Sequence, residues 1–419
     1  MPTSDTQAAT KSARFLTYAA YASFVPIGIA TVLLGPLLPT LSAQWSLNYS
    51  QAGALFTVQY VTSTCAVALS GVLASRRGFL FPIKAGLLLM SAGLALLFTG
   101  SRVLGIACIG AYGAGLGIAV PAANLLVADM NPSRRSAALN LLNFYWSAGA
   151  VACPFIVAAA SRMHHVATFL SVVAALSIVV AAAIALLPSN QVEPPSSKDA
   201  EPVLPLFRLH FAFFLMLAFL FFLYVGTENA LGGWVASFSK SLGSMTTSFA
   251  VMTPSFFYAS LMIGRWVAPI LLRRISDIRI AQAGLLLACV SSFCLVLSHR
   301  PLGVVFSACG AGFGLSSVYP ITISLLSRQF ESARVGSIMF TLSNIGGGLL
   351  PWAVGVASDH FGGVKAGLLM PLAGCAMMFL LFLPASASAE SPANENSADL
   401  SAGPSRCQAR EAHHTIERK

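Results

Sequence analysis

The sequence predicts an all-α membrane protein of twelve transmembrane helices in two pseudo-symmetric six-helix bundles. Three observations predict this fold: an apolar composition, a series of segments of membrane-spanning length, and a repeat that relates the two halves. Of the 419 residues, 56% are hydrophobic and 9% are charged, whereas a soluble domain carries about 25% charged residues. One water-soluble core would not bury that much apolar surface, so lipid is its natural solvent.

Twelve apolar segments follow one another along the chain, six on each side of a polar stretch. A helix needs about 20 apolar residues to cross the hydrocarbon core of a bilayer. We expect the first six spans at 15–41, 50–74, 80–100, 103–128, 136–160 and 166–188. We expect the second six at 208–238, 249–272, 278–298, 301–327, 333–357 and 364–386. The first segment is too long for the apolar part of a signal peptide, so we expect no cleaved signal.

Polar segments set the domain boundaries. We expect a cytoplasmic tail at 1–14, an N-terminal bundle at 15–188, a cytoplasmic linker at 189–207, a C-terminal bundle at 208–386 and a disordered cytoplasmic tail at 387–419. The linker is rich in Pro, Ser and charge, which is typical of a connection between two halves. The last segment is rich in Ser, Ala and Glu and then basic, a composition that does not form a core.

Basic residues predict the orientation. With the N-terminus inside, 18 of the 24 Lys and Arg residues fall on the cytoplasmic side, 5 fall outside and Arg265 remains inside a span. Cytoplasmic loops carry such an excess. We therefore expect a bacterial-type inner-membrane protein with both termini in the cytoplasm. The net charge of +10 is spread over these short loops, so we expect lipid and no nucleic acid as a partner.

One offset of 197 residues relates the second half of the sequence to the first. It brings Gly35 onto Gly232 and Gly149 onto Gly346. The same offset relates Pro154 to Pro351, the GxGxG at 113–117 to that at 310–314, and Arg76-Arg77 to Arg273-Arg274. Equivalent positions lie six helices apart, so the two copies have the same orientation. Parallel repeats place a solute site between the halves near the midplane, and rocking of the halves gives alternating access.

The loop after the second span carries Gly71-Val-Leu-Ala-Ser75-Arg76-Arg77-Gly78. It resembles the G-x-L-a-D-R-x-G signature of the major facilitator superfamily, although Ser75 replaces the expected Asp. The resemblance covers about residues 15–386. It implies a secondary transporter of a small solute, functional as a monomer because one chain holds both halves. It also implies a cytoplasmic gate at Gly71, Arg76, Arg77, Gly78, Arg273 and Arg274.

Two stretches resemble the fucose-permease-like and glucose-transporter-like sugar symporters, namely 138–146 and 226–234. This resemblance implies transport of a sugar. Fucose permeases carry acids in their first and fourth helices. Here the first helix has no acid, with Thr31 at the position that the repeat relates to Glu228, and the fourth has only Asp129 near its end.

Glu228 is the acidic residue inside a span, and an ionisable group there is a functional candidate because lipid makes it costly. We expect it to couple transport to H⁺. Binding of Na⁺, a hydrogen bond to a sugar hydroxyl, and a purely structural pairing stay open. Arg265 either extends toward the membrane surface or pairs with an acid. We expect no cofactor and no metal site, and the cysteines contain no CxxC pair.

Polar and aromatic side chains in the spans are the candidates for binding the solute. Amides on one helix face can bind several hydroxyls at once, and the alternative for each is a hydrogen bond between helices. The candidates are Asn143, Trp146, Asn140, Asn124, Gln59, Asn229, Trp234, Tyr224 and Asn344. Trp234 either stacks on a sugar ring or marks the outer interface. We expect Asp359 and His360 to be solvated.

The leading prediction is cation-coupled uptake of a small polar solute, and a sugar is the preferred candidate. The alternative on the same fold is efflux of drugs or metabolites by H⁺ antiport, which the 28 phenylalanines favour. A membrane enzyme or a non-transporting receptor fits poorly, because two matched halves surround one buried acid. No GxxxxGK[ST] motif is present, so ATP is not expected to drive transport.

Overall fold

A computed structural model of the protein describes residues 4–131, 135–186, 211–329 and 333–390, and the secondary structure of these ranges is helical. The N-terminal helices are α1 (Ser4–Val32), α2 (Leu34–Gln44), α3 (Tyr49–Arg77), α4 (Leu80–Leu96), α5 (Arg102–Met130), α6 (Arg135–Arg162) and α7 (Val166–Ala185). The C-terminal helices are α9 (Phe211–Ser241), α10 (Thr247–Leu271), α11 (Asp277–Leu297), α12 (Pro301–Leu315), α13 (Val318–Gln329), α14 (Ala333–His360), α15 (Val364–Gly367) and α16 (Leu369–Glu390).

These helices make the twelve predicted spans. Ten segments of the described ranges are long and apolar enough to cross a membrane, and α4 is a shorter apolar helix. The twelfth span is α10, which carries Arg265. Most helix ends lie within a few residues of the predicted spans. At the ends of the chain, α1 begins inside the expected tail 1–14 and α16 runs past residue 386. The linker 189–207 and most of the tail 387–419 lie outside the described residues.

Proline explains why three spans are built from two helices each. A proline ring clashes with the carbonyl of the residue four positions earlier and removes one helical hydrogen bond. The break between α1 and α2 lies just before Pro36, that between α12 and α13 before Pro320, and that between α15 and α16 before Pro371. A proline thus follows each interruption, although Pro121 and Pro154 lie inside unbroken helices.

Close backbone packing confirms the repeat at the level of single residues. Gly149 of α6 lies against the carbonyl of Val25 in α1, and Gly346 of α14 lies against the carbonyl of Phe222 in α9. Both glycines and both carbonyl residues are related by the predicted offset of 197 residues. Small residues allow helix backbones to approach this closely in membranes. Each half thus uses the same contact to join its first and fifth spans.

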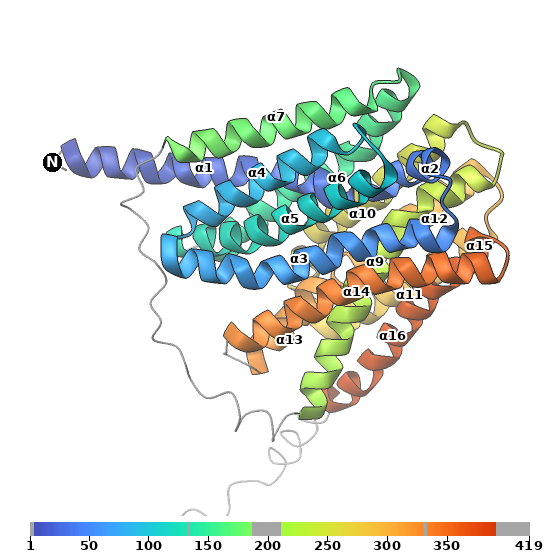
Figure 1. Cartoon of the computed structure of the whole chain (residues 1–419). Coiled ribbons are helices and arrows are strands. Elements are labelled where there is room, and N and C mark those ends of the chain that lie inside the picture. Colours follow the sequence, from blue (N-terminus) through green and yellow to red (C-terminus); the bar gives the residue numbers. More distant parts are fainter. Residues whose placement is uncertain (1–3, 132–134, 187–210, 330–332, 391–419) are drawn as a thin grey trace, which may run out of the picture.

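The two halves touch at one end of the molecule and separate toward the other (Figure 1). The closed end, defined by Tyr49 and Asp359, includes α2 and α15. There Gly53 of α3 lies against the backbone of Trp352 in α14, whereas a side chain at Gly71 would meet nothing within 4 Å. We call the opposite end, where α3 ends at Arg77, the parted end. The seams between the halves run along α3–α14, α6–α10 and α2–α9.

Candidate functional site

Glu228 and Arg265 form an ion pair between two helices of the C-terminal half. Glu228 lies near the middle of α9, and its Oε1 is 3.8 Å from Nη2 of Arg265 on α10. The side chains keep 11% and 21% of their surface exposed, respectively. The sequence left two roles open for Arg265, and the structure shows the one in which it pairs with an acid. A charged pair at this depth is costly unless both partners are present.

Tyrosines from four elements face the ion pair. Tyr60 of α3, Tyr224 of α9, Tyr258 of α10 and Tyr319 of α13 are all within electrostatic reach of Glu228. The predicted residue Tyr224 lies one turn from Glu228, and its ring is 5.2 Å from that of Tyr319. Its hydroxyl is buried beside both charged groups without a geometrically complete hydrogen bond. Tyr258 crosses close over the backbone of Gly232, a contact that glycine permits.

Trp146 links the ion pair to the N-terminal half. The guanidinium carbon of Arg265 lies 5.7 Å from the centroid of the Trp146 ring on α6, within the range of a cation–π contact. The indole N–H donates to Oγ1 of Thr31 in α1 at 3.3 Å. Arg265 therefore contacts both halves. Trp146, which the sequence suggested as a binding residue, lies beside the ion pair.

Gln59 and Asn229 are engaged by protein groups. Gln59 is 2% exposed, donates to the Thr31 carbonyl at 3.2 Å and accepts from the Tyr112 hydroxyl at 3.3 Å. Asn229 donates to the carbonyl of Val225 and accepts from the Tyr60 hydroxyl at 2.7 Å. The structure thus gives both amides the interhelical role that was the alternative to solute binding, and Asn229–Tyr60 joins the two halves.

Trp234 has neither of the two roles that its sequence position suggested. It is fully buried, and its indole N–H donates to the carbonyl of Pro351 at 2.8 Å. Its ring lies 6.2 Å from that of Tyr49 at the closed end. In this conformation the Trp234 side chain is covered by α14 and α3, at the seam between the halves.

Three predicted asparagines lie toward the parted end. Asn140 and Asn143 of α6 are exposed, and Asn143 lies one turn from Trp146. Asn143 donates to the carbonyl of Leu139 at 2.9 Å. Asn124 of α5 is half-buried and donates to Val120 of its own helix. Within the described residues, the hydrogen bonds of Asn124 and Asn143 use their amide N–H groups, and an amide oxygen is a further acceptor that suits a hydroxyl group.

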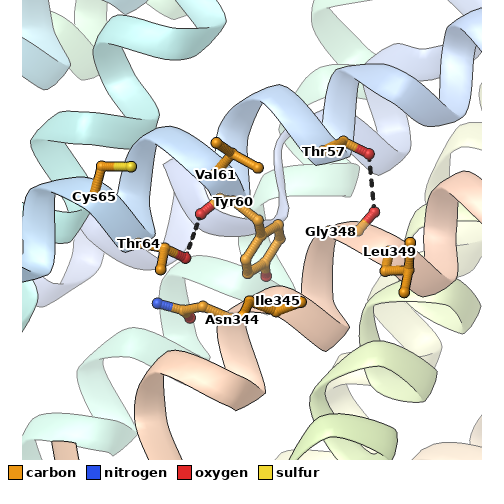
Figure 2. Close-up of a pocket in the computed structure, with 9 residues that line it drawn as sticks. All are labelled: Thr57, Tyr60, Val61, Thr64, Cys65, Asn344, Ile345, Gly348 and Leu349. Atoms are coloured by element: carbon orange, nitrogen blue, oxygen red, sulfur yellow. Dashed lines mark hydrogen bonds between the residues drawn. The ribbon is translucent and has the colours of Figure 1, made fainter. Parts of the chain in front are cut away.

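A pocket of about 340 Å³ lies between α3 and α14 (Figure 2). It is lined by Asn344 and Tyr60, and also by exposed apolar residues such as Val61 and Ile345. Exposed apolar side chains on a membrane protein face lipid. The pocket does not include Glu228. It therefore places the predicted residue Asn344 beside Tyr60, at the edge of the site rather than at its centre.

Asp359 is exposed, as expected, and it also joins the two halves. Its carboxylate accepts backbone hydrogen bonds from Tyr49 at 3.0 Å and from Ser50 at 2.7 Å, a role that the sequence did not predict. These N–H groups belong to the first turn of α3, which has no partner for them within the helix. A carboxylate there also faces the positive end of the helix dipole. Asp359 is thus a link between the halves at the closed end.

The predicted gate residues lie at the parted end. Gly78 ends α3 with a positive φ of 72°, a conformation that favours glycine. The guanidinium carbon of Arg77 lies 4.6 Å from the Phe81 ring centroid. Arg76, Arg273 and Arg274 are exposed. The structure places these groups at the end where the halves separate, and their role as a gate stays a prediction.

Comparison with known proteins agrees with this architecture. The family described as the Major Facilitator Superfamily matches residues 20–351. Sodium-dependent glucose transporter 1A of Mus musculus is 22% identical, over 81% of this chain and 89% of its own. The L-fucose-proton symporter of Escherichia coli (strain K12) is 23% identical, over 84% and 89%. The putative glucose/galactose transporter of Helicobacter pylori is also 23% identical, over 83% and 90%.

Solved structures share the fold. The crystal structure of FucP, a transporter in the outward conformation, superimposes with a TM-score of 0.62 at 22% identity, covering 88% of this chain and 98% of that one. A bacterial homolog of the human lysosomal transporter Spinster, inward-facing and occupied, gives 0.70 at 16% identity, covering 90% and 96%. The chain belongs to the Major Facilitator Superfamily. It is an integral membrane transporter of a small-molecule solute and not an enzyme.

Proposed function

We propose that this protein is a sugar–proton symporter of a bacterial-type inner membrane, working as a monomer with both termini in the cytoplasm. The observation that carries the proposal is the Glu228–Arg265 pair at mid-membrane, beside Trp146 of the opposite half. A carboxylate at this place can take a proton from one side and release it to the other as the halves rock. The proteins to which the chain is similar include a fucose–proton symporter.

The surroundings of Glu228 favour H⁺ over Na⁺ as the coupling ion. Arg265 lies 3.8 Å from the carboxylate, and a like charge at that distance repels a second cation strongly in a low-dielectric site. A proton meets the same repulsion, but it needs only one carboxylate oxygen, whereas a hard metal cation needs several oxygen ligands. The mouse relative is named a sodium-dependent transporter, so a Na⁺ gradient belongs in the test.

The charge distribution supports an inward-facing assignment for this conformation. The parted end carries Arg76, Arg77, Arg273 and Arg274, and cytoplasmic loops carry the excess of basic residues. With that orientation, the exposed Asn143 and Asn140 face the cytoplasmic side and Asp359 closes the outer side. The amides suit a neutral solute with several hydroxyl groups.

The test is uptake of a panel of radiolabelled monosaccharides into proteoliposomes under a pH gradient, a Na⁺ gradient or neither. For the wild type we expect concentrative uptake of at least one sugar that requires the pH gradient. Glu228→Gln removes the group that carries the proton, so concentration should be lost. Asp129→Asn, at an exposed acid near the end of α5, is the matched control and should retain uptake. No sugar uptake together with expulsion of hydrophobic dyes would establish efflux instead.

A further inference from the structure

We infer, resting on the proposed function, that Arg265 is the positioning residue that makes proton and solute cross together. In this inference the solute's hydroxyl oxygens replace the Glu228 carboxylate as acceptors for the guanidinium once Glu228 is protonated. The empty, protonated carrier is then the disfavoured state. Arg265 thereby suppresses proton leak, and the solute class it selects is one that offers several neutral oxygen acceptors on one face.

The geometry of the pair leaves Arg265 available for this exchange. The 3.8 Å contact joins one guanidinium nitrogen to one carboxylate oxygen and is longer than a charge-assisted hydrogen bond of about 2.7–2.9 Å. A guanidinium has five N–H donors. Its other close neighbours are the Trp146 ring and the Tyr224 hydroxyl, and an aromatic face is no conventional acceptor. Polyol oxygens can therefore enter without displacing a tight bidentate pair.

Charge balance supplies the coupling. Arginine stays protonated in proteins, so the net charge of the pair changes only when Glu228 gains or loses a proton. With Glu228 ionised, the empty site is neutral. A proton from water that binds a carboxylate oxygen leaves the Arg265 charge without its counter-ion, and removing one partner of a buried pair is strongly destabilising. On release, the same proton returns to water on the other side.

The groups around the pair do not neutralise the Arg265 charge once Glu228 is protonated. In the described part of the chain, the groups within electrostatic reach are Tyr60 of α3, Tyr224 of α9, Tyr258 of α10 and Tyr319 of α13. Tyr60 already donates to Asn229. None of these neighbours is a second carboxylate, so none replaces the negative charge of Glu228. The Tyr224 hydroxyl beside the guanidinium is one neutral acceptor, and a solute with several hydroxyl groups can supply the others.

Arg265 also lies where a change would be transmitted between the halves. Its guanidinium stacks on Trp146, which α1 holds through the hydrogen bond to Thr31. Residue 265 is nearer the parted end of α10 than Ser255, whose hydroxyl donates to Val151 of α6. Movement of the guanidinium toward a solute therefore alters the cation–π contact at the inner edge of the closed α6–α10 seam.

Five variants in proteoliposomes are compared with the wild type to test the inference: Arg265→Gln, Arg265→Lys, Glu228→Gln, the double variant of Arg265→Gln with Glu228→Gln, and Arg102→Gln as an exposed control at the start of α5. Solute-free proton entry is followed with an internal pH dye. Net uptake and equilibrium exchange of the transported sugar are measured on the same vesicles. Because the leak assay needs no solute, it tests Arg265 separately from the identity of the sugar.

Arg265→Gln should raise solute-free proton entry about tenfold and lose concentrative uptake. Glu228→Gln should keep exchange but lose net flux, because the empty carrier holds an unpaired arginine. The double variant should regain net downhill uptake that ignores pH, and the control should match the wild type. Arg265→Lys, which keeps the charge, should keep the leak low and guards against a simple folding defect.

An Arg265→Gln protein that is folded, proton-tight and still concentrative would overturn the inference and leave the proposed symport intact. A double variant with no more net flux than Glu228→Gln would overturn it as well. Wild type that moves no sugar with protons would instead overturn the proposed function on which the inference rests.

Discussion

At the scale of single residues, the site depends on the pairing of two opposite charges within the membrane. Glu228 is tolerated because Arg265 lies beside it, and Arg265 is tolerated because Glu228 and the Trp146 face surround it. Each charged group alone would cost more than the pair. In the proposed mechanism, Glu228 exchanges Arg265 for a proton, and Arg265 exchanges Glu228 for oxygen atoms of the solute. Neither charged group is then left without a partner.

How far the sequence predicts this site depends on the residue. An acid inside an apolar span identifies Glu228, because hydropathy alone shows where it lies. Its partner is harder to predict, because pairing depends on the relative depth and rotation of α9 and α10. Arg265 carried a signal, as the basic residue left inside a span. Tyr60, Tyr258 and Tyr319 carried none that distinguishes them from core aromatics.

Glycine contacts give a prediction at the same scale. Gly346 lies against the backbone carbonyl of Phe222, so the methyl groups of Gly346→Val have no space and must push α14 from α9. We expect a loss of about 1–3 kcal/mol of stability from this overpacking, measured as a lower thermal midpoint in detergent. Ala182→Val on an exposed face of α7 is the control. An unchanged midpoint for Gly346→Val would contradict the packing described for α9 and α14.

At the scale of elements, the sequence predicts candidate helix breaks better than it predicts which helix ends meet. Pro36, Pro320 and Pro371 lie just after the helix breaks, and the effect of each acts within one turn. Other prolines lie inside unbroken helices, so the sequence offers more candidate breaks than the structure has. The capping of α3 by Asp359 joins groups 309 and 310 residues apart. Its position near a helix end suggested solvent, because the sequence does not show which other helix end will face it.

The α3–α14 seam yields the element-scale prediction. Asp359→Ala removes the acceptor for the first N–H groups of α3, at a cost of about 1 kcal/mol, and should open the closed end more often. Spin labels at Met163→Cys and Leu302→Cys, exposed positions on opposite halves, report the separation in a cysteine-free background. We expect the long-distance population to rise about fivefold for a change of that size. His360→Ala, one residue away, should leave the distribution as it is.

A distance distribution that is identical for Asp359→Ala and the wild type would show that the carboxylate does not hold the closed end. Since Asp359→Asn keeps an acceptor oxygen but loses the charge, its position between wild type and Asp359→Ala separates the hydrogen bonds from the attraction to the helix dipole.

At the scale of the whole molecule, the sequence predicted most. The composition, the twelve spans and the offset of 197 residues are global signals that sum over many positions, so no single residue decides them. The structure adds which ends of the halves meet, a choice that one sequence does not make. Alternating access requires that the same chain adopt both arrangements, so the sequence encodes two sets of contacts at once.

Orientation gives the whole-molecule prediction. Cys407 follows α16 in the sequence, and the basic bias predicts that this tail lies in the cytoplasm. In a variant that keeps Cys407 as its single cysteine, a membrane-impermeant maleimide should label intact cells poorly and permeabilised cells fully. Equal labelling before permeabilisation would reverse the orientation and turn this conformation into an outward-facing one.

In the proposed symport, sugar and proton move together, and Glu228 carries the proton. The most direct measurement is the pH of a weakly buffered suspension of proteoliposomes when the transported sugar is added outside, with no imposed ion gradient. We predict that the sugar makes the medium more alkaline with the wild type and with Asp129→Asn, and leaves the pH unchanged with Glu228→Gln. Sugar entry with no pH change in the wild type, or an equal pH change with Glu228→Gln, would contradict the account.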